Sequence, residues 1–116
     1  MERRQRLSRS RDFEAVYRQG RSVSNRSLTL HWFVRDPDGA GEPRLGLAIP
    51  RAVGPAVTRN RLKRQLRAVW DELATEVPAG RDYVVAARPG LAEAAESRGH
   101  QWLVDQVREV IGKVHG

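Results

Sequence analysis

The stretch Arg59-Asn60-Arg61-Leu62-Lys63-Arg64-Gln65-Leu66-Arg67 carries five cations in nine residues, inside a run with a helical apolar period. Apolar side chains recur every three or four residues, with Trp70 at the margin, at Leu62, Leu66, Val69, Leu73 and Val77. This spacing predicts one buried stripe on a helix. At about 100° per residue, a neighbouring arc with Arg59 at its edge collects Asn60, Lys63, Arg64 and Arg67. The helix therefore has one face for a core and another for an anion.

The cations lie at the electrostatically unfavourable end of this helix. We expect it to begin near Gly54 or Thr58, with Pro55 suited to a first helical position. Cations in the first turns face the positive end of the macrodipole, which disfavours each by roughly a few tenths of a kcal/mol. A solvated charged face is the usual explanation of a charge run, but one arranged for stability would have the opposite polarity. We interpret the stretch as an anion site, and a phosphate backbone is the anion that needs so many cations.

Length and composition indicate one globular domain. The chain has 116 residues, 40% hydrophobic and 30% charged, enough for a modest core. It has no cysteine, which excludes disulfides and thiolate metal sites and fits a reducing compartment. No apolar run approaches a transmembrane length, and the basic N-terminus lacks the apolar stretch of a signal peptide. We therefore expect a cytoplasmic protein.

The positive charge belongs to the first part of the chain. Residues 1–70 hold 16 Lys and Arg against 6 Asp and Glu, a net charge of +10, whereas residues 71–116 hold 5 against 8, a net charge of −3. Of the 21 cations, 19 are arginine, whose planar fork suits bidentate phosphate contacts and stacking on bases. Charge alone supports a nucleic acid or an acidic membrane as partner and does not choose between them.

The N-terminal part predicts a basic flexible arm over residues 1–9, followed by one domain over 10–116. Ser10 can cap a short helix from Arg11 to Gln19, ended by Gly20. The spacing places Phe13, Val16 and Tyr17 on one face of that helix. Aromatic residues at this spacing usually pack in a core. The nearby cations Arg11 and Arg18 leave a surface that stacks single-stranded bases equally open.

The remainder predicts three strands and further helices. Residues 22–35 read as extended and two-sided, residues 44–49 as a second strand and residues 82–88 as a third. In the second strand, Gly46 and Ala48 leave one face nearly bare, so an aromatic, a helix or a ligand can approach closely. Residues 91–97 read as one or two loose helical turns, and residues 101–114 as a last amphipathic helix. The order is α, then β strands, then α–β–α, a single-domain α+β sandwich.

The sequence shows no catalytic or metal-binding constellation. The histidines His31, His100 and His115 are scattered, and none has acids or other histidines at a metal-ligand spacing. No glycine-rich phosphate fingerprint stands between a strand and a helix. No pair of acids stands out for acid–base or two-metal chemistry. The pattern is typical of a binding module.

Several segments together resemble the bacterial ribonuclease P protein component. The most specific are a strand and the approach to the basic helix with the helix itself, residues 45–49 and 53–67, including Arg59-Asn60-Arg61. Supporting segments, in the right order and spacing, are residues 11–17 (Arg-Asp-Phe-Glu-Ala-Val-Tyr), Asn25-Arg26 and residues 82–88 (Asp-Tyr-Val-Val-Ala-Ala-Arg). They cover essentially the whole chain.

The resemblance implies a ribosomal-S5-domain-2-like sandwich with a left-handed βαβ crossover. It implies an endoribonuclease holoenzyme in which a catalytic RNA subunit, which also holds most of the Mg²⁺, removes the 5′ leader of precursor tRNA. The residues expected to bind the RNA subunit are Arg59, Asn60, Arg61, Lys63, Arg64 and Arg67. Those expected in a cleft for the leader are Phe13, Tyr17, His31, Arg11 and Arg18. The RNA subunit and precursor tRNA are the expected partners, with no membrane and no obligate protein partner.

The chain departs from the family pattern at three places. Pro55 stands where asparagine is common, Ala52 where a cation is common, and His31 where the cleft often has an aromatic. The alternative function is a structural ribosomal protein or another RNA-binding protein outside tRNA processing. A helix-in-groove DNA binder is disfavoured because no helix-turn-helix pair precedes the basic helix. An autonomous nuclease is disfavoured by the missing acids.

Overall fold

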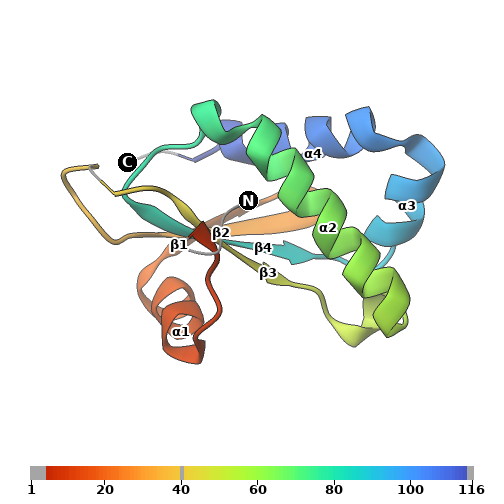
Figure 1. Cartoon of the computed structure of the whole chain (residues 1–116), viewed down its shortest axis with the longest axis horizontal. Helices are drawn as coiled ribbons and strands as arrows, with labels where there is room; N and C mark the ends of the chain where they lie inside the picture. Colours follow the sequence, from red (N-terminus) through yellow and green to blue (C-terminus); the bar gives the residue numbers. More distant parts are fainter. Residues whose placement is uncertain (1–4, 40, 115–116) are drawn as a thin grey trace.

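The computed structural model describes residues 5–39 and 41–114, which form a four-stranded sheet with helices on both faces (Figure 1). The first four residues of the predicted arm lie outside the described residues. The helices and strands follow in the order α1 (Ser10–Gln19), β1 (Arg21–Ser24), β2 (Leu28–Val34), β3 (Arg44–Ala48), α2 (Ala56–Glu72), β4 (Arg81–Ala87), α3 (Leu91–Arg98) and α4 (His100–Gly112). The predicted α+β class is confirmed, with α3 as a full helix where loose turns were expected.

The sheet has the strand order β1-β2-β4-β3. β2 pairs antiparallel with both β1 and β4, whereas β3 pairs parallel with β4, so β3, α2 and β4 form a βαβ unit. The left hand of this crossover stays a prediction. The extended segment predicted over 22–35 is two strands, because the Asn25 carboxamide oxygen accepts the Ser27 and Leu28 N–H groups at 2.9 and 3.0 Å and turns the chain.

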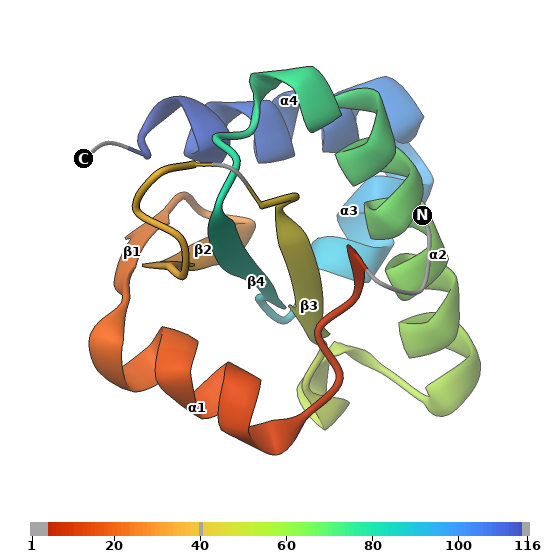
Figure 2. The same ribbon diagram turned by 60° about the vertical axis from the view of Figure 1, so that its left-hand side comes forward.

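Alternating residues of the strands divide the molecule into two layers of packing. On one face, Leu30, Trp32 and Val85 belong to the main core beneath α2, α3 and α4. On the other face, α1 packs over a smaller cluster that includes Val16 and Val84 (Figure 2). The sheet therefore presents α1 to one side of the molecule and the basic helix to the other. No helix within the described residues is long and apolar enough to cross a membrane.

The basic helix α2 buries the predicted stripe. Leu62, Leu66 and Val69 are at most 2% exposed, and Trp70, expected at the margin, is itself buried at 3%. The helix begins one residue after Pro55, which occupies the N-cap with extended backbone rather than the first helical position. It ends at Glu72, and Leu73 and Val77 stay in the core through a short 3-10 turn over Ala74–Glu76. The apolar stripe therefore continues past the end of the α-helix as far as Val77.

The predicted flexible arm over 1–9 needs correction where the structure describes it. Leu7 is 5% exposed and packs with Val16 and Val84 under α1. Its N–H donates to the Leu45 carbonyl at 2.8 Å, next to a parallel bridge between Arg6 and Leu45. One apolar residue and one backbone hydrogen bond thus fix this segment along the free edge of β3.

One buried acid ties the outer part of the sheet together. Asp82 of β4 is 3% exposed, accepts two hydrogen bonds from Arg44 at 2.7 and 2.8 Å, and pairs with Arg35. Hydrogen bonding to this carboxylate raises the pKa of Arg44, so its guanidinium stays charged. Asp82 is therefore a structural charge, with its oxygens occupied by the protein's own cations.

Candidate nucleic-acid interface

The polar arc of α2 lies on the surface as the sequence predicted, clear of the core stripe. Asn60, Arg61 and Arg64 are exposed, and Arg59, Lys63 and Arg67 are half-buried. Arg59 differs from the rest because its Nε donates to the Gly54 carbonyl at 3.1 Å, which fixes the loop that leads into the helix. Arg61 approaches Glu96 of α3 at 4.0 Å, a loose surface pair. The departures Ala52 and Pro55 are both exposed beside this arc.

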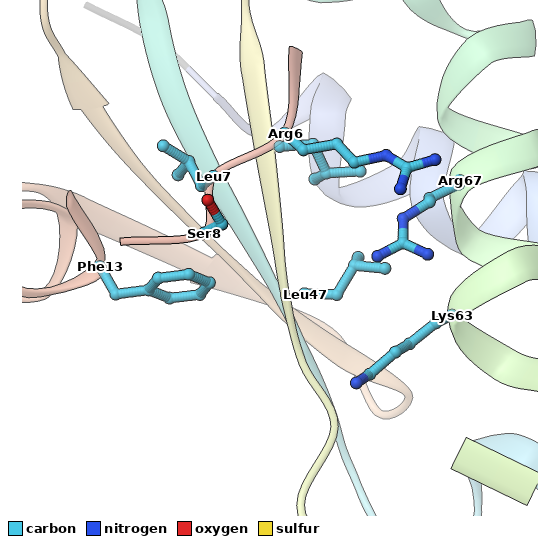
Figure 3. Close-up of a pocket in the computed structure, with 8 residues that line it drawn as sticks. Arg6, Leu7, Ser8, Phe13, Leu47, Lys63 and Arg67 are labelled. Carbon is cyan, nitrogen blue, oxygen red and sulfur yellow. The ribbon is translucent and has the colours of Figure 1, made fainter. Parts of the chain in front are cut away.

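Two cations of α2 meet a third that the sequence patterns did not predict. Lys63 and Arg67 lie one helical turn apart and line a pocket of about 470 Å³ together with Arg6 of the N-terminal segment. Figure 3 shows the Arg6 and Arg67 side chains extending toward one another across the end of the pocket, with Lys63 along the same helix. Leu7, Phe13, Leu45 and Leu47 give this cationic pocket an apolar wall.

The cationic pocket is arranged for an anion. Burial, and then the neighbouring Arg6 charge, lower the pKa of Arg67. Both effects penalise the charged guanidinium, which has no counter-ion among the described residues, and none of the residues that line the pocket is acidic. A bound phosphate would remove both penalties. Sequence reasoning missed Arg6. Its signal was Leu7, a single apolar residue in an otherwise basic segment, because burial of Leu7 against the domain brings the neighbouring Arg6 to the pocket.

The predicted cleft beneath α1 is divided between this pocket and an exposed aromatic surface. Phe13 lines the cationic pocket. Tyr17 and His31 lie next to Phe13 and form the aromatic surface, with ring centroids 4.8 Å apart in an edge-on arrangement. The Phe13 and Tyr17 centroids are 6.5 Å apart, so the three rings form one continuous row. Tyr17 is 47% exposed, enough for a base to stack on it.

Neither polar ring of the aromatic surface carries a charge near neutral pH. Burial lowers the pKa of His31 below its ordinary value, so the imidazole is neutral at pH 7. Burial raises the pKa of the Tyr17 hydroxyl, which therefore remains a neutral hydrogen-bond donor. The two side chains offer stacking and hydrogen bonds, while the cations of the neighbouring pocket supply the charge.

The bare strand face predicted at Gly46 is filled by the protein itself. A Cβ atom at Gly46 would lie 2.6 Å from Cζ of Phe13 and 3.1 Å from Cβ of Leu7. Glycine is required here so that the Phe13 ring can rest on the strand backbone. Of the three possibilities left open for this face, an aromatic, a helix or a ligand, the structure shows an aromatic, because the Phe13 ring occupies the space over Gly46.

The structure does not bring Arg11 and Arg18 to the aromatic surface. Both are exposed on α1. At 100° per residue they project roughly 120–140° away from the direction of Phe13 and Tyr17. Their charge faces solvent on the outer side of the helix, and the cations that approach the aromatic row are those of the pocket.

Metal-binding groups are not clustered in the part of the chain that the structure describes. No group of three or more His, Cys, Asp or Glu side chains there could hold a metal ion. The buried carboxylate Asp82 is engaged by Arg35 and Arg44. The described surface is suited to binding a polyanion.

Comparison with known proteins gives a consistent result over the whole chain. A sequence model of the Ribonuclease P family matches residues 1–114. The ribonuclease P protein component of Rhodococcus opacus is 43% identical over 94 residues, which cover 78% of this chain and 75% of the relative. That of Geobacillus kaustophilus is 32% identical over 118 residues, covering 100% and 94%. The solved RNase P protein of Thermotoga maritima superposes with a TM-score of 0.85 at 28% identity, covering 96% of this chain and 98% of that one.

Proposed function

The chain belongs to the ribonuclease P protein family. From this membership we propose that two surfaces, the polar arc of α2 and the aromatic row with its cationic pocket, bind two different RNA molecules. The chain is the protein component of a tRNA-processing endoribonuclease, and its partner there is the RNA subunit. The proposal concerns how this chain's own residues serve that enzyme.

The exposed arc of α2 binds the RNA subunit. Asn60, Arg61 and Arg64 are exposed in the first half of the helix, and none of them fills the core. The arc supplies donors and positive charge to a phosphate backbone that crosses this half of the helix. That placement, with cations and an amide gathered on one exposed arc beside the core stripe, is the single observation that carries the proposal.

The aromatic row and the cationic pocket bind the 5′ leader of precursor tRNA. Tyr17 and His31 present neutral rings, and Lys63, Arg67 and Arg6 gather beside them around an apolar wall. Rings beside cations suit a single strand, whose bases stack while its phosphates pair with the charges. Because Lys63 and Arg67 belong to α2, the leader would run directly against the RNA subunit at this point.

Mg²⁺ does not fit the donors of this interface. The ion prefers carboxylate, carbonyl and water oxygens in an octahedral arrangement, whereas the α2 arc offers guanidinium, ammonium and amide groups. We therefore assign Mg²⁺ to the RNA subunit. The protein's contribution is to neutralise phosphate repulsion, which reduces the Mg²⁺ concentration that the RNA needs.

Reconstitution tests this proposal. Precursor tRNA is incubated with a ribonuclease P RNA at limiting Mg²⁺, with and without the protein, and with the protein alone. We expect efficient cleavage only when RNA and protein are combined. The proposal fails if the protein gives no gain at limiting Mg²⁺, or if RNA-free protein cleaves the substrate by itself.

A further inference from the structure

The turn between β1 and β2 is fixed onto α4 by side-chain hydrogen bonds. Asn25 Nδ2 donates to the Gln106 carbonyl at 3.1 Å, and Ser27 Oγ donates to Gln106 Oε1 at 2.8 Å. Between these anchors stands Arg26, exposed at the tip of the turn. The position of Arg26 relative to α4 is therefore set by the fold.

A pocket of about 350 Å³ opens beside Arg26, between the turn, α3 and α4. Arg26 and Arg98 are its cations, and Leu91 and Trp102 contribute apolar surface. None of the residues that line it is acidic. Its volume falls in the range of roughly 300–1,000 Å³ in which ligand pockets are found, and it shares no lining residue with the cationic pocket.

Trp102 gives this pocket a partly exposed aromatic surface. The tryptophans Trp32 and Trp70 are 2% and 3% exposed in the core, whereas Trp102 is only partly buried. The guanidinium carbon of Arg98 lies 5.6 Å from the centroid of the Trp102 ring. An accessible indole paired with arginine is the combination on which single-stranded bases stack.

The cations of this pocket differ from two other exposed cations of the C-terminal part in having no acidic partner within the part of the chain that the structure describes. Residues 71–116 carry a net charge of −3. Within them, the exposed cations Arg108 and Lys113 are paired with Glu76 at 3.3 Å and Glu109 at 3.9 Å. Arg98, by contrast, makes no ion pair within residues 5–39 and 41–114, and neither does Arg26 across the pocket. The two cations are left available for an anionic ligand.

The pocket lies at the end of the sheet where α2 begins. β4 ends beside the start of β2, with Ala87 opposite Leu28, and Ala48, the last residue of β3, lies opposite Ala86. Helix α3 runs next to the first half of α2 (Figure 1), where Glu96 faces Arg61 at 4.0 Å. An RNA that covers the α2 arc can therefore continue past α3 to reach Arg98.

We propose that Arg26, Arg98 and Trp102 bind one nucleotide of the RNA subunit, with its base on Trp102 and its two flanking phosphates on the arginines. This inference rests on the proposed function, and it extends the RNA-subunit interface from α2 across α3 to α4. The RNA subunit is the occupant favoured by the charge of the pocket and by its continuity with the α2 arc.

The double substitution Arg26→Ala and Arg98→Ala tests the charge contacts. We expect affinity for the RNA subunit to fall about tenfold. The slope of log affinity against log salt should become shallower by about 1.4, or about 0.7 for each single-strand phosphate contact. Arg108→Ala is the matched control, because Arg108 is an exposed α4 arginine already paired with Glu76. A double variant that binds like the control overturns the inference. If instead the unaltered protein does not bind the RNA subunit, the proposed function itself has failed.

Tryptophan emission tests the base contact. In the unaltered protein, acrylamide should quench Trp102 in preference to the two buried tryptophans, and the RNA subunit should protect it. That protection should disappear in Trp102→Leu, and a melting curve shows whether this variant is folded. The Arg26→Ala and Arg98→Ala variant keeps Trp102, so it tests the site without removing the indole. Quenching that the RNA does not change overturns the inference. Protection by free adenosine monophosphate at the same concentration would also overturn it and would assign the pocket to a free nucleotide.

Discussion

Phe13 and Tyr17 lie one helical turn apart on the same face of α1, yet their surroundings differ. Phe13 rests on the backbone at Gly46 and contacts the small cluster beneath the helix. Tyr17 is 47% exposed and meets His31 edge-on. The sequence predicts the shared face but not this difference, because the packing of Phe13 depends on a glycine more than thirty residues away.

Tyr17→Ala should separate binding from stability. We expect precursor tRNA to bind the holoenzyme roughly tenfold more weakly, because one stacked base is worth about 1–3 kcal/mol. The free energy of unfolding should change by less than about 0.5 kcal/mol, as for most surface substitutions. Phe13→Ala, measured beside it by thermal melting, should lower stability as well. Equal destabilisation by the two substitutions would contradict the division of the aromatic row.

His31 should make the protein less stable as the pH falls below its ordinary pKa. Burial lowers the pKa of His31 in the folded state, so the unfolded chain binds the proton more readily. Stability therefore rises with pH through the window below about 6.5 and levels off above it. The difference in melting temperature between the unaltered protein and His31→Gln, followed from pH 5 to pH 8 by the same buffer series, isolates this contribution. A difference that does not change with pH would contradict the buried, neutral histidine.

Helix α2 is the element whose role depends most on the placement of its charges. Its core stripe anchors it to the sheet through Leu62 and Leu66, and its cations, between Arg59 and Arg67, lie on the remaining surface. There are no acidic residues in its first turn to offset them. This element is arranged for binding at some expense of stability.

Replacing Arg61 and Arg64 with alanine should weaken binding of the RNA subunit while the fold holds. For each phosphate that the variant no longer neutralises, the slope of log affinity against log salt should decrease by roughly 0.7–0.9. The melting temperature should stay the same or rise, because alanine favours the helix and the macrodipole penalty is removed. Normal RNA binding together with a much lower melting temperature would show that the helix is purely structural.

Asp82→Asn should destabilise the edge of the sheet. The substitution leaves Arg35 and Arg44 facing a neutral amide in a largely buried position. Breaking a buried pair costs about 3–5 kcal/mol, and the low end is expected because both arginines reach solvent. Urea unfolding measures the loss, and Asp38→Asn in the neighbouring loop is the exposed control. A loss equal to that of the control would show that the cluster contributes nothing.

For the whole molecule, periodic patterns predict most of the architecture. The α2 stripe, the alternation in β2 and the order of elements are local properties, and the structure confirms them. Contacts between distant segments are not encoded in any one stretch. Leu7 fixes the N-terminal segment on β3, so Arg6 joins Lys63 and Arg67 only after folding. The outward direction of Arg11 and Arg18 is also a local property, because the helical period of α1 already turns them away from Phe13 and Tyr17.

The α2 arc and the aromatic row meet at the cationic pocket, which Phe13, Lys63 and Arg67 line together, yet we propose that the two surfaces bind different RNAs. The most direct measurement places two variants in one experiment: the α2 variant Arg61→Ala with Arg64→Ala, and Tyr17→Ala. For each, the affinity for the RNA subunit is measured, together with the ratio of holoenzyme affinities for precursor and mature tRNA. We predict that the α2 variant loses affinity for the RNA subunit and keeps the ratio once saturated with RNA. Tyr17→Ala should bind the RNA subunit normally and lose the preference for precursor tRNA. If both variants lose RNA-subunit affinity and the preference for precursor tRNA in equal measure, the α2 arc and the aromatic row form one binding surface, and the proposal is wrong.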